Sequence, residues 1–230
     1  MKKLYKLKFF RLFLKDLMIA RNRMLSLVFM LVFYFGIVFV SFKQIKEVTS
    51  FFNNNMILIF FAMFFVQTVI IISMMIFPYF IYPESMRGKH LVYFAYQYSI
   101  FEVVLGKSLF MFLFSILPSY ICVFYFFSPI IKFSNIFCLT FFLAVPLLAF
   151  SIVLFNVYVT WFTKLGKLLN IFFILIIVLG FSKIKNILNL SLNFPDYYIP
   201  MTGIIFSIFF ISLVFGLAKI NKKERVILNK

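Results

Sequence analysis

The sequence predicts an all-α, polytopic membrane protein with six transmembrane helices, and three observations carry this prediction. Apolar residues make up 65% of the 230 residues, while only 13% are charged, about half the fraction usual in a soluble domain. The apolar residues occur in long runs that approach the ~20 residues needed to cross a hydrocarbon layer of ~30 Å. Lys and Arg lie between these runs, as in the loops that flank membrane spans.

Residues 1–23 predict a separate amphipathic helix that lies in the cytoplasmic interface of the membrane. At 100° per residue, apolar side chains gather on one face, and Lys8, Lys15 and Asp16 point away from it. A basic polar side of this kind suits a helix on the membrane surface. A simple anchor for the first span is the alternative. The apolar face consists of Leu7, Phe10, Leu14, Leu17 and Met18.

Residues 24–219 predict the six-helix transmembrane domain, and residues 220–230 a basic cytoplasmic tail. The fifth apolar run has only 14 residues and spans the membrane only if Lys164 and Lys167 extend to the interface. Five spans are therefore the alternative. The six runs are Met24–Phe42, Met56–Tyr82, Lys107–Phe127, Ile136–Tyr158, Leu168–Phe181 and Met201–Ala218.

The distribution of positive charge predicts the orientation of these spans. With six spans, eighteen of the 23 Lys and Arg residues fall on the side that carries both termini. Because Lys and Arg mark the cytoplasmic side, both termini are expected in the cytoplasm and the chain in the plasma membrane. An odd number of spans would place the basic tail outside, which favours keeping the fifth span.

The net charge of +17 does not indicate nucleic-acid binding, since the cations lie between apolar runs and not on a folded polar face. Cys122 and Cys138 lie inside apolar runs and are expected to be small buried hydrophobes. The single His90 has no Cys, His or acidic cluster beside it. The sequence therefore offers no ligand set for a metal and predicts no cofactor of its own.

The stretch "FEVVLGKS" ends like a nucleotide-binding loop, but it lacks the rest of that motif. The loop requires Gly-x-x-x-x-Gly-Lys-Ser/Thr between a strand and a helix, and its first Gly allows the backbone to curl around the phosphates. Counting back from Gly106, that position is Phe101. The chain is therefore not expected to bind or hydrolyse ATP by itself, and it is not expected to be an enzyme.

The segment between the second and third spans, "PESMRGKHLVYFAYQYSIFEVVLGKSLFMF", contains Glu84 and Gly88 and, further on, Glu102, Gly106 and Lys107. With these residues it resembles the permease subunits of type-2 ATP-binding cassette (ABC) transporters. These subunits show a Glu, a Gly four residues on, an apolar helix with a frequent Pro-Ser pair, and a Glu…Gly-Lys entry into the third span. Glu84 and Gly88 match the first pair, and the matches to the entry are Glu102, Gly106 and Lys107. The apolar stretch is aromatic here, "LVYFAYQYS", and Gln97 stands where Pro is common.

The resemblance implies a permease that forms half of a translocation pathway in an ABC exporter. Its partners would be two copies of a cytosolic ATPase, which bind the ATP, and a second permease chain, identical or homologous. A coupling helix over residues 83–106 would meet the ATPase. The residues implied in this coupling are Glu84, Arg87, Gly88, Glu102, Gly106 and Lys107.

The side chains between the second and third spans are also chemically suited to contact a soluble partner. Tyr93, Phe94 and Tyr98 are apolar enough to pack into a cleft on a soluble partner, whereas a free loop with so many aromatic residues would be an aggregation liability. Near the cytoplasmic interface, Glu102 and Lys107 are expected to pair with each other or with the N-terminal helix.

No predicted span contains an unambiguous central charge, and charges at membrane depth mark ion and proton paths. The interior rich in Phe and Met indicates instead a hydrophobic or amphipathic cargo, such as an antimicrobial peptide, a lipid or a drug. The alternative is a six-span protein outside the ABC class: a channel, a membrane enzyme or a membrane scaffold.

Overall fold

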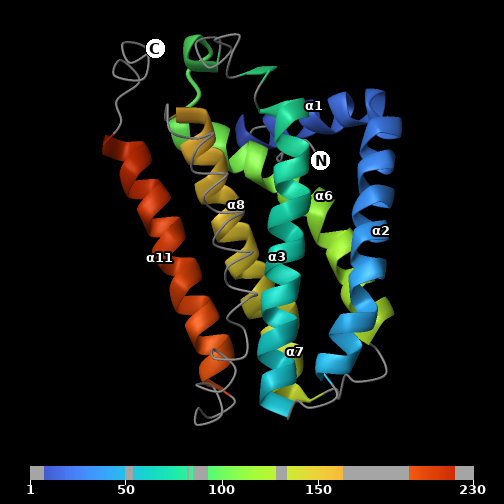
Figure 1. Ribbon diagram of the computed structural model, residues 1–230. Helices are drawn as coiled ribbons and strands as arrows, with labels where there is room; N and C mark the ends of the chain where they lie inside the picture. The colour runs from blue at the N-terminus through green and yellow to red at the C-terminus, as the bar shows by residue number, and fades with distance from the viewer. Residues whose placement is uncertain are drawn as a thin grey trace.

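The computed structural model describes residues 8–49, 54–81, 83–84, 93–127, 134–162 and 197–220. Within these ranges all the regular structure is helical, and long helices stand side by side in a bundle (Figure 1). The helices are α1 (Lys8–Asn22), α2 (Met24–Thr49), α3 (Asn54–Phe80), α6 (Ile100–Phe127), α7 (Asn135–Leu139), the π-helix η2 (Thr140–Ala144), α8 (Val145–Phe162) and α11 (Tyr198–Ile220). The all-α prediction is thus confirmed for the described part of the chain.

Four helical stretches in the described ranges are long and apolar enough to cross a bilayer. The bent pair of α1 and α2 raises this number to five if it counts as one span. The six predicted spans are therefore not all confirmed, and the predicted fifth span, Leu168–Phe181, lies outside the described residues. The four stretches are Ile57–Phe80, Ile100–Tyr125, Asn135–Phe162 and Tyr198–Ile220.

Helix α1 turns sharply away from the direction of α2. The two helices are bent by 82° at a break that contains Arg23, and α1 crosses one end of the bundle (Figure 1). Its buried face consists of Leu12, Asp16 and Ala20, which recur every four residues and so form one stripe. The prediction that Asp16 points away with the polar side is wrong, because this carboxylate has a partner inside the bundle.

The apolar residues predicted to share one face of α1 do not pack uniformly on the bundle. Leu17 and Met18 are 50% and 65% exposed. Helix α1 therefore has two apolar surfaces, one against the bundle and one directed outward.

The span Asn135–Phe162 contains a π-helical turn, Thr140–Ala144, that ends two residues before Pro146. A Pro inside a helix leaves carbonyl groups without their usual donor. Here the Tyr120 hydroxyl of α6 donates to the Phe141 carbonyl at 3.1 Å. A neighbouring helix thus satisfies a backbone group that the irregular turn frees, as a membrane interior demands.

Hydroxyl groups in the bundle also find partners inside it. Thr68 donates to the Phe64 carbonyl at 2.8 Å and accepts from the Tyr34 hydroxyl at 3.0 Å, which ties α2 to α3. Ser108 likewise donates to the Val104 carbonyl within α6, at 2.7 Å. Such bonds allow hydroxyls in an apolar bundle without unpaired donors.

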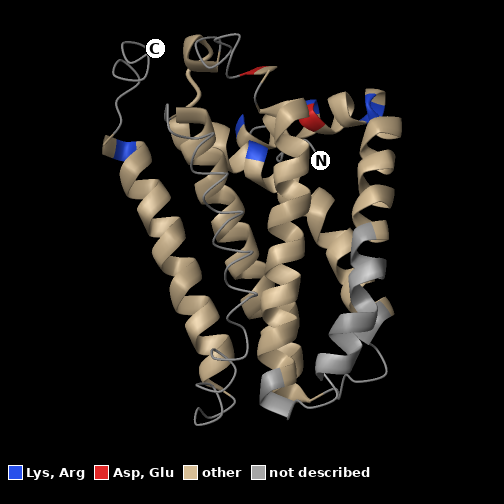
Figure 2. Cartoon of the chain, in the orientation of Figure 1, with Lys and Arg blue, Asp and Glu red and all other residues tan. Residues whose placement is uncertain are grey.

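The charged residues whose side chains the structure describes gather at the end of the bundle where α1 lies (Figure 2). Lys and Arg dominate this end (Figure 2). The Lys and Arg residues with described side chains are Lys8, Arg11, Lys15, Arg21, Arg23, Lys107 and Lys219. This end is the one at which a site for charged chemistry has to be sought.

The predicted coupling helix over 83–106 is not one continuous helix. A short helical turn at 93–95 ends at Gln97, and α6 begins at Ile100. The residues predicted as the end of the coupling helix therefore form the first two turns of a transmembrane helix, which starts before the predicted Lys107. Residues 85–92, with Arg87 and Gly88, lie outside the described residues.

Candidate functional site at the junction of α1 and α6

Gly106 allows α1 to lie directly against the start of α6. A Cβ atom at this position would lie 2.6 Å from the Phe9 carbonyl oxygen and 2.9 Å from the Leu12 Cβ. Real Cβ atoms do not come that close to backbone atoms, so only Gly fits here. In the Gly-Lys pair, the Gly brings the N-terminal helix into contact with α6.

Lys107, the next residue, is fully buried and forms two ion pairs. Its Nζ atom lies 2.5 Å from Asp16 Oδ1 on α1 and 2.8 Å from Glu84 Oε2. The side chains of Lys107 and Asp16 are both 0% exposed. A buried charge of this kind is tolerated only when it is paired, so the three residues depend on one another. Lys107 lies seven residues, or ~10 Å, along α6 from its start.

Glu84 and Lys15 extend this cluster towards the surface. Lys15 Nζ lies 2.7 Å from Glu84 Oε1, and Lys15 also donates to the Tyr93 hydroxyl. Tyr93 in turn donates to Glu84 Oε2 at 3.0 Å. The cluster thus contains two ammonium groups and two carboxylates, so it is electrically balanced. We call Lys15, Asp16, Glu84, Tyr93 and Lys107 the junction cluster.

An aromatic residue of α8 completes the surroundings of Lys107. The Nζ atom lies 5.4 Å from the centre of the Trp161 ring, within the range of a cation–π contact. The Trp161 and Tyr93 rings are 6.0 Å apart. Together with Trp161, the junction cluster therefore connects α1, the helical residues 83–84, the turn at Tyr93, α6 and α8.

Glu102 has a different and local role. The Ser99 backbone N–H and hydroxyl donate to Glu102 Oε2 at 2.8 Å and 2.9 Å, and the Glu102 N–H donates to Ser99 Oγ at 3.1 Å. This reciprocal pattern is a capping box, which fixes the start of α6. The expected alternative of a Glu102–Lys107 pair is therefore wrong, and the other alternative, a Lys107 pair with the N-terminal helix, is confirmed.

The departure at Gln97 has a backbone explanation. Gln97 has a φ of 60°, and its N–H donates to the Phe94 carbonyl at 3.0 Å. Pro is fixed near a φ of −65° and has no N–H, so Pro cannot occupy this position in this turn. The turn directs Tyr93 inward, 7% exposed, while Tyr96 is 71% exposed. The expectation that Tyr93 faces a soluble partner is therefore wrong.

The structure thus brings Glu84, Gly106 and Lys107 together and places Glu102 a short distance away as a cap. Asp16 and Tyr93 belong to the same cluster, although sequence analysis did not count them as site residues. Asp16 is the one acidic residue among the basic residues of the N-terminal segment 1–23, and this isolation is the signal that points to it.

Burial and ion pairing shift the pKa values of the Asp16 and Glu84 carboxyl groups in opposite directions. Burial raises the pKa of Asp16 from 3.8 to about 6, although Lys107 opposes the shift. Burial also acts to raise the pKa of Glu84, but Lys107 and Lys15 outweigh it and hold this pKa below its usual value of 4.5. Burial and the adjacent Glu84 raise the pKa of Tyr93, so its hydroxyl stays protonated and donates.

These directions predict a pH-dependent contribution to stability from Asp16. A raised pKa in the folded state means that the contribution is complete below pH 3.8 and is lost as the pH rises through about 6. We expect the difference in unfolding free energy, Asp16→Asn minus wild type, to increase between pH 4 and pH 7. Thermal unfolding of both proteins in detergent across this range measures it.

Glu84→Gln is the matched control for this experiment. Because the pKa of Glu84 is lowered, its contribution is present above pH 4.5 and is lost only as the pH falls further. The Glu84 charge also helps to raise the pKa of Asp16, so the difference between this variant and wild type should change between pH 5 and pH 7 by less than that of Asp16→Asn. A level difference for Asp16→Asn over the same range would contradict the assigned burial of this carboxyl.

Comparisons with known proteins identify no relative: no family model, curated protein or solved structure matches the chain.

Proposed function

We propose that the chain is the permease subunit of an exporter of the ABC class, driven by a separate cytosolic ATPase. The observation that carries the proposal is the junction cluster. Glu84, Gly106 and Lys107, three of the residues that resemble the type-2 permease pattern, share one contact with α1. These residues are far apart in the sequence but meet in one buried contact. Such a contact can transmit a movement of the segment around Glu84 to α1 and α6.

In this mechanism the ATPase acts on the segment that contains Glu84 and the exposed Tyr96. A displacement of that segment reaches α6 through the Glu84–Lys107 pair and α1 through the Glu84–Lys15 pair. Since buried ion pairs do not deform gradually, the segments move together between discrete arrangements. ATP then drives transport to the extent that the two arrangements bind the cargo with different affinity.

The charged end of the bundle lies on the cytoplasmic face in this proposal, with both termini inside the cell. The Lys and Arg residues whose side chains the structure describes gather there (Figure 2), in agreement with the preference of these residues for the cytoplasmic side. The ATPase pair and a second permease chain, identical or homologous, complete the assembly. The chain itself supplies no nucleotide site.

The cargo we propose is hydrophobic or amphipathic, such as an antimicrobial peptide, a lipid or a drug. In the described part of the chain, large apolar side chains such as Phe206, Ile208 and Phe209 of α11 are more than half exposed, so this helix offers an apolar surface to a cargo. The buried charges described above lie at the end of the bundle and not along its length.

Affinity purification of the full chain from its native membranes tests the proposal. We expect an ATPase with the sequence Gly-x-x-x-x-Gly-Lys-Ser/Thr to co-purify, and we expect ATP hydrolysis only when that partner is present. A Lys→Ala change in the motif of the partner is the control, because it removes hydrolysis without altering this chain. Hydrolysis by the chain alone, or recovery of the intact chain without any ATPase, would contradict the proposal.

A further inference from the structure

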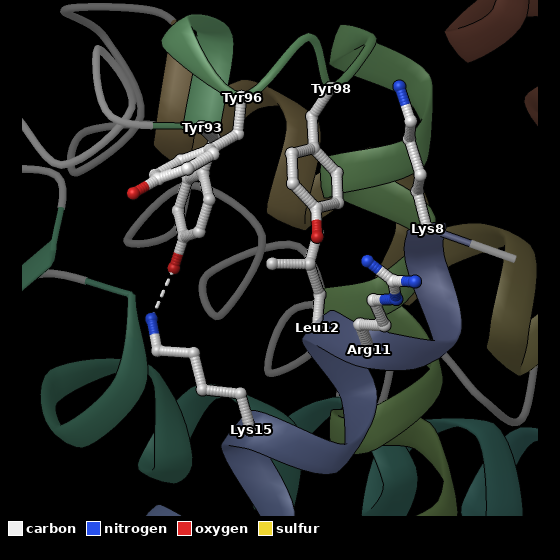
Figure 3. Close-up of a pocket in the computed structure, with 7 residues that line it drawn as sticks. All are labelled: Lys8, Arg11, Leu12, Lys15, Tyr93, Tyr96 and Tyr98. Atoms are coloured by element: carbon white, nitrogen blue, oxygen red, sulfur yellow. Dashed lines mark hydrogen bonds between the residues drawn. The ribbon is translucent and has the colours of Figure 1, made fainter. Parts of the chain in front are cut away.

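We propose that the cavity between α1 and the Tyr93–Tyr98 turn binds the phosphate headgroup of an anionic phospholipid. The cavity has a volume of about 370 Å³, within the range of small-ligand sites. Three cations of α1 form one wall, and three tyrosines of the turn lie across from them; the hydroxyls of Tyr93 and Tyr98 point toward α1, and that of Tyr96 points to the side (Figure 3). The lining residues are Lys8, Arg11, Leu12, Lys15, Tyr93, Tyr96 and Tyr98.

The chemistry of this lining selects an anion with several acceptor oxygens. The lining contains three cationic side chains and no carboxylate, and of its three hydroxyls that of Tyr93 already donates to Glu84. Lys8 is held in place by its bond to the Gln97 carbonyl at 2.8 Å and by the Tyr98 ring 5.8 Å away. Lys8 keeps further N–H donors beyond this bond, and the guanidinium of Arg11 offers the planar fork that fits phosphate.

A second cavity argues for a lipid rather than a soluble phosphate. It has a volume of about 480 Å³ and shares Arg11 and Lys15 with the first. The rest of its lining is mainly apolar, with Leu14, Met18 and Ile19, and Met18 is 65% exposed. A ligand that satisfies both cavities has a phosphate next to an alkyl chain, and an interfacial helix meets such molecules in the membrane.

Bound lipid would also affect the junction cluster. Lys15 lines both cavities and at the same time pairs with Glu84 and Tyr93. A phosphate beside Lys15 therefore holds α1 and the Tyr93 turn together from the outside. This inference requires the membrane location of α1 and does not depend on the proposed transport function.

The test titrates the full chain in detergent with dioleoyl phosphatidylglycerol and counts bound lipid by native mass spectrometry. We expect saturable binding of this lipid, and much weaker binding of dioleoyl phosphatidylcholine, which has no net charge. The Lys8→Gln/Arg11→Gln variant should bind phosphatidylglycerol about thirtyfold more weakly, from about 1 kcal/mol per cation. Arg21→Gln/Arg23→Gln removes the same charge near the other end of α1 and should bind like wild type.

Two further arms identify the source of the phosphate. Inorganic phosphate and glycerophosphoglycerol, the headgroup without acyl chains, should compete poorly, because neither fills the apolar cavity. Met18→Gln should weaken the binding of phosphatidylglycerol and leave the binding of inorganic phosphate and of glycerophosphoglycerol unchanged.

Four results would overturn the proposal. The first is equal binding of the two lipids, and the second is an equal loss in both double variants, which would indicate diffuse attraction only. The third is competition by inorganic phosphate as strong as by the lipid. The fourth is that the Lys8→Gln/Arg11→Gln variant binds lipid like wild type but no longer binds a protein partner. This result would show that these cations contact that partner and not a lipid.

Discussion

Replacement of Lys107 by Met is expected to destabilise the protein by about 3–5 kcal/mol, the usual effect of removing one partner from a buried ion pair. The change leaves the Asp16 carboxylate, which is 0% exposed, without its cation. Glu84 retains Lys15 and Tyr93 as partners. Most of the loss of stability is therefore expected from the unpaired Asp16 carboxylate. Burial of an unpaired charge is among the few single changes with an effect this large.

A double variant separates loss of the pair from loss of the Lys107 side chain. Asp16→Asn/Lys107→Met removes both charges, and we expect it to recover most of the lost stability, since a neutral replacement of a buried pair is often tolerated. Lys219→Met, in the last turn of α11 and outside the junction cluster, is the surface control and should change stability by about 0.5 kcal/mol at most.

Trp161 provides the measurement for these variants. It is the single Trp of the chain, it is 1% exposed, and its ring lies 5.4 Å from Lys107 Nζ. Its fluorescence during denaturant or thermal unfolding therefore reports on the junction itself. Wild-type stability of Lys107→Met, or a double variant no more stable than the single one, would show that the two charges do not depend on each other.

The second large effect is expected from Gly106→Ala. The added Cβ would lie 2.6 Å from the Phe9 carbonyl oxygen, which belongs to the backbone of α1 and has no flexible end to move. Helix α1 must then shift as a unit, with an expected loss of about 1–3 kcal/mol, the usual result of overpacking. The loss arises although Ala is the better helix former by about 1 kcal/mol.

Gly216→Ala in α11 isolates the steric part of this effect. A Cβ at Gly216 meets nothing within 4 Å, so the same change should leave stability unchanged or raise it by about 0.5–1 kcal/mol. Displacement of α1 is measured separately by maleimide labelling at Leu12→Cys in a Cys122→Ala/Cys138→Ala background, because Leu12 is 3% exposed whereas the native Cys138 is exposed. Labelling should accelerate in Gly106→Ala only. Equal behaviour of the two glycine variants would exclude a close contact of α1 and α6.

The long helices were predictable because each requires only an uninterrupted apolar run of sufficient length. Ile57–Phe80 and Tyr198–Ile220 match two predicted spans to within a few residues at each end. The start of α6 was missed by seven residues, although Ser99-x-x-Glu102 before an apolar run is a recognisable capping signal. The charged Glu102 was interpreted as part of an interface, and its local partner was overlooked.

The junction cluster was predictable only in part. The Glu84 and Gly-Lys positions are recognisable by their spacing. A helical projection, in contrast, assigns charged residues to the water-exposed face and therefore places Asp16 on the surface. The partner that draws Asp16 inward, Lys107, is 91 residues away. The sequence of α1 marks Asp16 as its one acidic residue but does not identify this partner, and nothing in the aromatic stretch predicts that Tyr93 points inward.

The most direct test of the account asks on which side of the membrane the junction end of the bundle lies. Tyr96 is exposed at this end, and Asn135 is exposed at the start of α7. In a Cys122→Ala/Cys138→Ala background, Tyr96→Cys and Asn135→Cys are treated separately with a membrane-impermeant maleimide in intact cells. The account predicts labelling of Asn135→Cys in intact cells and of Tyr96→Cys only after the membrane is opened. Labelling of Tyr96→Cys in intact cells would contradict it, because no cytosolic ATPase reaches the outer face.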